Sequence, residues 1–301
     1  MPNGLLILTQ NPGIYNNTRL AQEAKNLGLT CQFLNVYDSF LPCPNPSSLA
    51  LKARSWQEFI VMHRQSGRID DQFDILFSKY LQTQQVKISN PPEALEQLKN
   101  KEFQTLFFAQ HGLPTVPTFS LRGKIGLEVL SQQISHWRCD RFIVKTVLGQ
   151  KGIGVTLVNG EESLVSLLST LQAIGDQRFL IQPFIEDSRE VRFFMIKNRP
   201  LVVFEKLRKS GFKNNLAYSE IKQVPADLLS CDLFMAMQKI VDKILSVVKL
   251  DYCAIDFIFS NHKEALLYLL EVNLSPGFEG PEQHFGINMA RSILQTIADT
   301  K

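Results

Sequence analysis

Two apolar segments near the C-terminus each carry side chains with oxygen ligands. The run 252–259 is apolar apart from Asp256, and the run 270–274 contains Glu271 and Asn273 two residues apart. Both runs are typical of strands, in which residues at i and i+2 share a face. An ionised carboxylate inside a buried strand needs a cation or several hydrogen-bond donors. The chain must therefore fold so that these charges on consecutive strands are compensated.

These three side chains predict a metal site. Mg²⁺ prefers oxygen ligands and usually keeps positions for phosphate and water, and Mn²⁺ is a second candidate. The alternative is structural, because a lone Asp can be a hydrogen-bonded sheet residue and Asn before Pro-Gly is ordinary turn chemistry. Since two carboxylates lie on consecutive strands joined by the polar turn 260–264, we favour a metal site formed by Asp256, Glu271 and Asn273.

Composition excludes several classes of protein. The 301 residues are 45% hydrophobic and 20% charged, without low-complexity tracts, which indicates a globular chain of two or three lobes. Lys plus Arg number 32 against 29 Asp plus Glu, too balanced to indicate a nucleic-acid or membrane partner. No apolar run reaches ~18 residues and the N-terminus lacks a signal-peptide pattern. Five cysteines without C-x-x-C spacing suit free thiols in a reducing compartment, so we expect a cytoplasmic protein.

The first 90 residues predict a small α/β domain. A strand over 5–9, a helix over 18–27 and a strand over 31–37 form a β-α-β unit with a parallel sheet. Ser55 with Glu58 resembles a capping box that starts a helix ending near Gly67, and 73–80 is predicted as a buried strand. We place the main domain boundary near residue 90, giving domains 1–90 and 91–301.

Beyond the boundary, helices and strands mix without a fixed repeat, which predicts an α/β (α+β) fold. The segment Asn90-Pro91-Pro92 starts a helical region, and Asn100 caps a second helix through Gln110. The remaining predicted strands are near 116–121, 141–147, 155–158, 179–184, 190–196 and 201–207, followed by the two strands that carry the acidic residues. The remaining predicted helices are near 125–137, 161–173, 226–248 and 287–298.

A lysine on a strand leads into a glycine-containing loop. Lys145 is followed by Gly149, Lys151, Gly152 and Gly154, and glycines let backbone N–H groups approach phosphate closely. The segment is not a P-loop, because no Gly-Lys-Ser/Thr follows, and not a Rossmann fingerprint, because a strand and not a helix comes next. It predicts a strand–loop–strand cover over phosphates, although such a hairpin can also be a simple turn.

A second set of charges follows. Glu190 and Arg192 share one strand face, and Lys206, Arg208, Lys209 and Lys213 come shortly after them. A solvated hairpin surface would explain the later cations. A site for a magnesium triphosphate beside a substrate carboxylate would require several of them.

Taken together, these motifs resemble the RimK-like branch of the ATP-grasp ligases. The resemblance covers about residues 90–298 and, more weakly, 1–40. It rests on the segments 142–145, 149–155, 181–185, 190–192, 271–273 and 275–280 together with Asp256. It implies two lobes, 91–184 and 185–301, that clasp ATP between two sheets, preceded by a parallel α/β domain at 1–90.

The resemblance also implies roles for individual residues. Lys101 and Lys145 contact phosphates, residues 182–185 form a hinge that faces adenine, and Glu190 binds the ribose. The implied nucleotide-binding set is Lys101, Lys145, Gly149, Lys151, Gly152, Gln182, Pro183, Phe184, Ile185, Glu190 and Lys213. The implied catalytic set is Arg192, Lys213 and Asn215, with Arg192 facing the phosphates or a substrate carboxylate. Asp256, Glu271 and Asn273 hold one or two Mg²⁺.

Three features depart from the family pattern. Pro183 stands where an acidic residue is common, which removes a hinge contact. Lys213 stands where arginine is usual, which replaces a planar fork with a point charge. The segment 74–92 is expected to be short, because the strand 73–80 is followed almost at once by Asn90, where relatives insert a further helix.

The sequence therefore predicts an ATP-dependent ligase that joins a carboxylate to an amine of an amino acid, peptide or protein tail. The expected route is an acyl phosphate, with ADP and phosphate released. A peptide ligase that closes side chains into rings is an alternative within the same fold. From another class, an ATP-binding regulatory or scaffold protein is the alternative that the short segment 74–92 supports. Homo-oligomerisation is left open.

Overall fold

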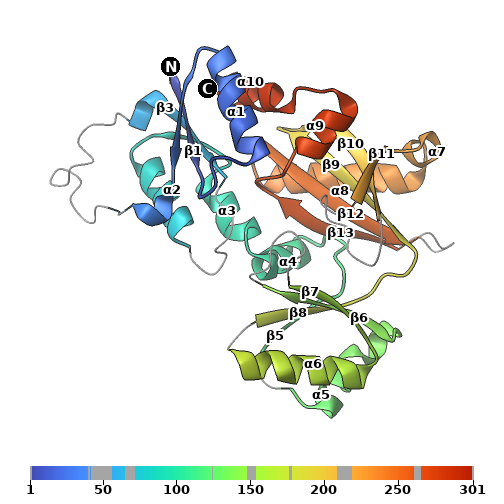
Figure 1. The fold of residues 1–301 in the computed structure, drawn as a ribbon. Helices are drawn as coiled ribbons and strands as arrows, with labels where there is room; N and C mark the ends of the chain where they lie inside the picture. Colours follow the sequence, from blue (N-terminus) through green and yellow to red (C-terminus); the bar gives the residue numbers. More distant parts are fainter. Residues whose placement is uncertain are drawn as a thin grey trace.

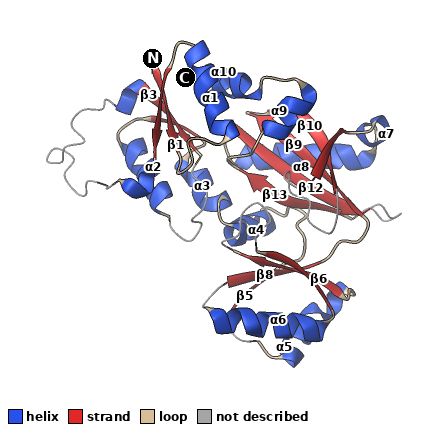
Figure 2. Ribbon diagram, in the orientation of Figure 1, coloured by secondary structure: helices blue, strands red, loops and turns tan. Residues whose placement is uncertain are grey.

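Three sheets organise the computed structural model of this chain (Figure 1). The structure describes residues 2–39, 41, 56–64, 72–123, 125–147, 154–175, 178–208, 219–260 and 266–299. Figure 2 shows that helices accompany each of the three sheets. None of the helices in these ranges is long and apolar enough to span a membrane.

The first sheet is parallel and has the strand order β2-β1-β3-β4. Its elements are β1 (Gly4–Leu8), α1 (Tyr15–Asn26), β2 (Thr30–Leu34), β3 (Phe59–His63), α2 (Phe73–Thr83) and β4 (Lys87–Ser89), with 3-10 turns η1 (Val36–Asp38) and η2 (Trp56–Glu58). Every residue of β1 and β3 is buried, because layers pack on both faces of the sheet. Leu5 and Ile7 face α1 and α10 (Met289–Asp299), whereas Leu6 and Leu8 face α2.

Three predictions in this part are wrong. The expected helix after Glu58 is strand β3, whose continuous run Phe-Ile-Val-Met is buried on both sides; Ser55 and Gly67, which bounded that prediction, lie outside the described residues. The expected strand 73–80 is helix α2, which places Phe73, Phe77 and Leu81 on one stripe against the sheet. The segment 74–92 therefore contains a helix and a short strand, so the expected lack of a helix there is also wrong.

The second sheet is a small antiparallel lobe with the order β5-β8-β6-β7. Its strands are β5 (Phe119–Arg122), β6 (Arg141–Thr146), β7 (Val155–Asn159) and β8 (Arg178–Pro183), and its helical elements are α5 (Leu127–Ile134), η3 (Ser135–Trp137) and α6 (Glu161–Ile174). Both helices lie on the same side of the sheet (Figure 1). The core of this lobe joins Phe142 and Val144 of β6 to Leu164 and Leu168 of α6.

The third sheet is antiparallel with the order β11-β10-β9-β12-β13. Its strands are β9 (Ser188–Ile196), β10 (Arg199–Arg208), β11 (Ser219–Gln223), β12 (Tyr252–Ser260) and β13 (Leu267–Asn273). One face packs on α3 (Pro92–Leu98), α4 (Lys101–Gln110) and α8 (Asp232–Val247) through residues such as Phe193 and Phe257. The predicted long helix 226–248 is two helices, α7 (Ala226–Leu229) and α8, and α9 (Glu279–Phe285) was not predicted.

Asn90 connects the first sheet to the third. Its side-chain nitrogen donates to the carbonyls of Tyr252 (2.8 Å) and Leu274 (2.9 Å), and its Oδ1 accepts from Asp251 N. Its φ is +60°, a conformation that asparagine tolerates better than most residues. The predicted capping of α4 by Asn100 is confirmed, because its side chain accepts from Glu102 N. The domain boundary near residue 90 stays a prediction.

Candidate active site

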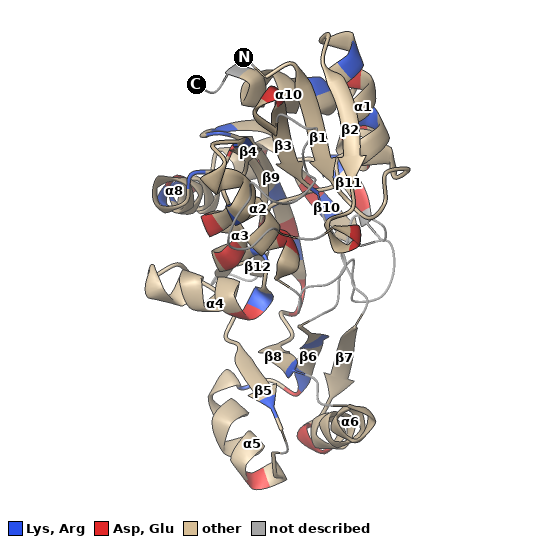
Figure 3. Cartoon of the chain, turned by 90° about the vertical axis from the view of Figure 1, so that its left-hand side faces the viewer, with Lys and Arg blue, Asp and Glu red and all other residues tan. Residues whose placement is uncertain are grey.

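One face of the large sheet gathers charged side chains from four neighbouring strands. In the strand register, Asp256 of β12 lies opposite Arg192 of β9 and Glu271 of β13, and Lys206 of β10 lies opposite Glu190 of β9. Residues directly opposite each other project to the same side of a sheet. Figure 3 shows acidic and basic positions together on the strands of this sheet. The register thus brings charged residues that are up to 81 positions apart in sequence, from Glu190 to Glu271, onto one face of the sheet.

Arg192 and Asp256 form the centre of this group. Arg192 Nε and Nη2 donate to the two Asp256 oxygens at 2.5 Å each. Lys206 Nζ donates to Asp256 Oδ2 at 3.1 Å and lies 2.8 Å from Glu190 Oε2. Arg192 Nη2 also lies 3.6 Å from Glu271 Oε1, so the two carboxylates face one guanidinium nitrogen. Asp256 is fully buried, whereas the Glu271 side chain is 37% exposed.

Charge pairing opposes the effect of burial on these groups. Burial favours neutral Asp256, but Arg192 and Lys206 hold the pKa of this carboxyl well below its usual range. Burial likewise favours the neutral forms of Arg192 and Lys206. The negative charge of Asp256 outweighs this effect and raises the pKa of both groups above their ordinary values, and Glu190 adds to the effect on Lys206. All three groups are therefore charged at neutral pH.

The small lobe contributes a lysine to the same place. Burial, followed by the charge of Lys101, lowers the pKa of Lys145 on β6 to about 8, while Glu271 and Glu190 act in the opposite direction. These charges act on Lys145 because they lie near it, although they belong to other elements. Lys101 is the first residue of α4. The structure thus places Lys145 and Lys101 where the small lobe meets the charged face of the large sheet.

The predicted hinge residues lie in the connection between the two lobes. Gln182 and Pro183 end β8, and Phe184 and Ile185 lead towards β9. Gln182 Nε2 donates to Thr118 Oγ1 at 2.8 Å, and the Arg141 guanidinium lies 4.4 Å from the centre of the Phe184 ring. The connection therefore has defined contacts on the small lobe, and its role towards adenine stays a prediction.

The predicted metal ligands fit a cation by their donor chemistry. Glu271 and Asn273 share a side of β13, and Asn273 lies across from Ala254, two residues before Asp256. Among the described residues, Asn273 Oδ1 accepts one hydrogen bond, from Ser275 N at 3.1 Å, and an amide oxygen has a second lone pair. Asp256 Oδ1 likewise receives a single hydrogen bond from the described part of the chain, from Arg192 Nε. In the part of the chain that the structure describes, no three His, Cys, Asp or Glu side chains group as a metal site, so Asn273 is an essential member of the predicted set.

Some predicted site residues lie outside the described ranges: Gly149, Lys151, Gly152, Lys213 and Asn215. Conversely, Lys206 was not among the predicted site residues, although it bonds both Glu190 and Asp256. The sequence feature that pointed to Lys206 was the cluster of cations after Arg192. Only the register of the β9–β10 hairpin shows which of these cations faces the site. Pro200 lies at a register shift in that hairpin, and without the shift Glu205 would lie opposite Glu190.

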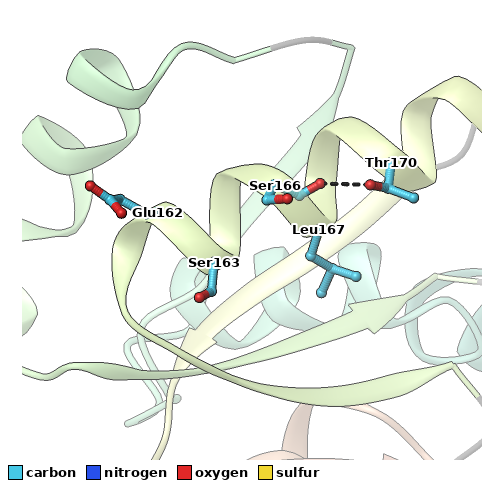
Figure 4. A pocket seen from close by; sticks show the side chains of 5 residues that line it. All are labelled: Glu162, Ser163, Ser166, Leu167 and Thr170. Carbon is cyan, nitrogen blue, oxygen red and sulfur yellow. Dashed lines mark hydrogen bonds between the residues drawn. The ribbon is translucent and has the colours of Figure 1, made fainter.

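A surface depression lies elsewhere on the small lobe. It is lined by Glu162, Ser163, Ser166, Leu167 and Thr170 of helix α6 (Figure 4). Thr170 Oγ1 donates to the Ser166 carbonyl within that helix. None of the charged site residues lines this depression, and we assign it no role.

Comparison with known proteins identifies the family. The model of the RimK-like ATP-grasp domain matches residues 79–297. A probable alpha-L-glutamate ligase of Legionella pneumophila (strain Corby) is 24% identical over 97% of this chain and 94% of its own length. The fold is similar to D-alanyl-alanine synthetase A from Vibrio cholerae (TM-score 0.71, 17% identity, 100% of this chain and 99% of that one). It is also similar to a RimK domain ATP-grasp protein from Sphaerobacter thermophilus (TM-score 0.69, 13% identity, 97% and 99%). The chain belongs to the RimK-like ATP-grasp family of carboxylate–amine ligases and is an enzyme that forms amide bonds.

Proposed function

We propose that the enzyme joins L-glutamate, through its amine, to the carboxylate of a peptide or protein, using ATP to form an acyl phosphate. The observation that carries this proposal is the proximity of Lys145 of the small lobe to Glu271, Glu190 and Lys206 on the charged face of the large sheet, where Arg192 and Asp256 also pair. The choice of glutamate is supported by relatives that are named as glutamate ligases.

The chemistry explains why cations gather there. A carboxylate is a poor electrophile, and transfer of the γ-phosphoryl group to one of its oxygens gives it a leaving group. The amine then attacks the carbon, the C–N bond forms, and phosphate leaves with the oxygen. In this proposal Lys101 and Lys145 neutralise the phosphate charge, and Arg192 faces the transferred group or the carboxylate. Lys213 and Asn215, which lie outside the described residues, would contact the phosphates, residues 182–185 would face adenine, and Glu190 would bind the ribose.

A divalent cation, Mg²⁺ in this proposal, would neutralise charge on the phosphate oxygens during transfer. Glu271 and Asn273 would hold it, with Asp256 Oδ1 as a third ligand. Arg192 and Lys206 keep Asp256 ionised and fixed for that purpose.

Isotope transfer tests the route. A peptide labelled with heavy oxygen in its carboxylates is incubated with enzyme, Mg-ATP and L-glutamate. We expect labelled inorganic phosphate, formed in step with the amide, and ADP as the nucleotide product. Unlabelled phosphate during amide formation, or AMP as product, would overturn the acyl-phosphate route. A panel of other amino acids, run for phosphate release, tests the choice of glutamate.

The alternative of a regulatory or scaffold protein has lost the observation that favoured it. It depended on a missing helix in residues 74–92, and α2 occupies that segment. The second alternative, ring closure within a peptide, would give products without added amino acid, so omitting L-glutamate from the same assay separates the two activities.

A further inference from the structure

Arg64 is a buried cation at the end of β3 for which the structure shows no carboxylate partner among the described residues. The residue is 5% exposed. Its Nε donates to Asn17 Oδ1 at 3.0 Å and its Nη2 to the Pro276 carbonyl at 3.3 Å, both neutral acceptors. The third nitrogen, Nη1, is buried and has no hydrogen-bond partner among the residues that the structure describes. Burying an ion without a counter-ion is costly, so this arginine needs an anion that the described chain does not supply.

A neighbouring arginine shows what a compensated site looks like. Arg19 of α1 donates Nε and Nη2 to the Glu282 carboxylate at 3.1 and 3.2 Å, and its Nη1 lies 3.3 Å from Glu23. Arg19 joins helix α1, and Arg64 joins the end of β3, to the segment after β13. Only Arg64 does so without an acidic side chain within ion-pair distance in the described part of the chain.

The orientation of Arg64 is fixed by a connected set of polar groups. Asn17, which is fully buried, accepts from Arg64 and donates to Thr9 Oγ1 at 3.0 Å and to the Asn11 carbonyl at 2.9 Å. The Arg64 guanidinium also lies 5.8 Å from the centre of the buried Phe278 ring. A donor held in place before binding loses little conformational entropy when a ligand arrives. The arrangement is thus suited to recognition.

The place in the fold points to a ligand site. Arg64 follows β3 at the carboxyl end of a parallel sheet, and its backbone N–H donates to Leu8 O at the end of β1. The chain leaves β1 towards β2 on one side and leaves β3 towards β4 on the other, which makes the β1–β3 boundary a topological switch point. Ligands of open α/β sheets bind at that position.

The distance to the charged face suits an amino acid. Ser275 N bonds Asn273 Oδ1, Ser275 Oγ donates to the His63 carbonyl at 2.7 Å, and Arg64 reaches Pro276. Because Pro276 is three residues beyond Asn273, their Cα atoms are at most about 11 Å apart. An anion at Arg64 can therefore belong to a molecule whose other end reacts near Glu271 and Asn273. The nucleotide-binding candidates Lys145 and 182–185 belong to the small lobe and its connection instead.

We propose that Arg64 binds a carboxylate that does not react, belonging to the amino acid that supplies the amine. An amino acid that donates its amine keeps its own carboxylate ionised throughout, so a fixed guanidinium can hold it before and after the C–N bond forms. This inference rests on the proposed function for the identity of the ligand. The bond from Nη2 to the Pro276 carbonyl is the longer of the two side-chain bonds, and in this proposal the ligand's carboxylate replaces it.

Thermal melts test the site without requiring turnover. The full chain, with a non-hydrolysable ATP analogue and Mg²⁺, is melted with each of the common amino acids, with the carboxamide of each, and with inorganic phosphate. Arg64→Gln removes the charge and keeps a donor for Asn17, Arg64→Lys keeps the charge and loses the fork, and Arg19→Gln is the matched control. We expect at least one free amino acid to raise the melting temperature of the wild type and the control but not of Arg64→Gln, and its carboxamide to lack the effect.

Kinetics with the same variants completes the test. We expect the KM for the amino acid to rise roughly ten- to hundred-fold in Arg64→Gln, from loss of a charge-assisted contact, with an unchanged affinity for the ATP analogue. The inference would be overturned if amino acids raised the melting temperatures of the wild type and Arg64→Gln equally, or if no amino acid raised the melting temperature of the wild type. A rise in melting temperature with phosphate alone would also overturn it. If amino acids give shifts that depend on Arg64 while none stimulates phosphate release, the proposed function fails and the carboxylate site stands.

Discussion

The environment of Lys145 gives the most specific prediction about nucleotide binding. Its pKa is lowered to about 8, first by burial and then by Lys101, so the lysine is partly neutral in weakly alkaline solution. Phosphate groups favour the charged form, which gives the nucleotide highest affinity below pH 8. As the pH rises through 8, binding must take up a proton, and affinity falls by up to about tenfold per pH unit.

We therefore predict a loss of affinity for a non-hydrolysable ATP analogue between about pH 7 and 10 that disappears in Lys145→Met. The variant should also bind about ten- to hundred-fold more weakly at neutral pH. Calorimetric titrations in two buffers with different ionisation enthalpies measure both the affinity and the proton uptake. A wild type with constant affinity over this range would remove Lys145 from the nucleotide site.

Asp256 and Glu271 should respond differently to loss of charge. Asp256→Asn leaves Arg192 and Lys206 buried with too little negative charge, so we predict a loss of about 3–5 kcal/mol in unfolding free energy. Glu271→Gln changes a side chain that is 37% exposed and should fold nearly as well as the wild type while losing most metal-dependent turnover. Denaturant unfolding and phosphate release distinguish them. Full activity in Glu271→Gln, or in Asn273→Ala, would contradict the predicted metal ligands.

At the scale of elements, the hairpin of β6 and β7 depends on one glycine. Gly154 has a φ of +76°, and a Cβ at this position would overlap Thr146 Oγ1. Its carbonyl accepts from Thr146 N at 2.8 Å, which closes the hairpin. We predict that Gly154→Ala costs about 1–3 kcal/mol, and less in a Thr146→Ala background, where the hydroxyl is gone. A double-mutant cycle from urea unfolding measures the coupling, and equal costs in both backgrounds would show that Thr146 is not the obstacle.

Elements differ in how far the sequence predicts them. Strands β9, β10, β12 and β13 of the large sheet and the capped helix α4 were predicted, because alternation, turn residues and Asn100 all indicated the same structure, whereas β11 was not predicted. Strand β3 and helix α2 were interchanged, since both are short dense apolar runs whose periodicity is hidden when two faces are buried. Residues Arg192, Asp256 and Glu271 were predicted to share a site, but Lys206 required the register shift at Pro200, and the unpaired nitrogen of Arg64 has no sequence signal.

In the whole molecule, the hydrophobic clusters cut across the predicted domain boundary. Leu5 and Ile7 of the first sheet pack in one cluster with Phe194 and Tyr252 of the third, and α1 lies beside α10 (Figure 1). The small lobe has a cluster of its own. We therefore predict that hydrogen exchange will show β1 and β12 opening together. Strands β6 and β8 should open independently of them, with a lower free energy of opening, and an ATP analogue should add protection to the amide protons of β6. Separate opening of β1 and β12 would support independent folding of residues 1–90.

The ion pairs on the large sheet also set a charge balance. Glu190 and Asp256 are acidic and Lys206 and Arg192 are basic, so the formal charges of these four buried side chains cancel. Among the described residues of this face, Glu271 would then be the carboxylate left to attract a divalent cation, with Lys145 nearby as a repelling charge. The apo protein should consequently bind free Mn²⁺ or Mg²⁺ weakly, and the metal should enter already bound to the triphosphate. Titration of Mn²⁺ by electron paramagnetic resonance, with and without the ATP analogue, measures the difference.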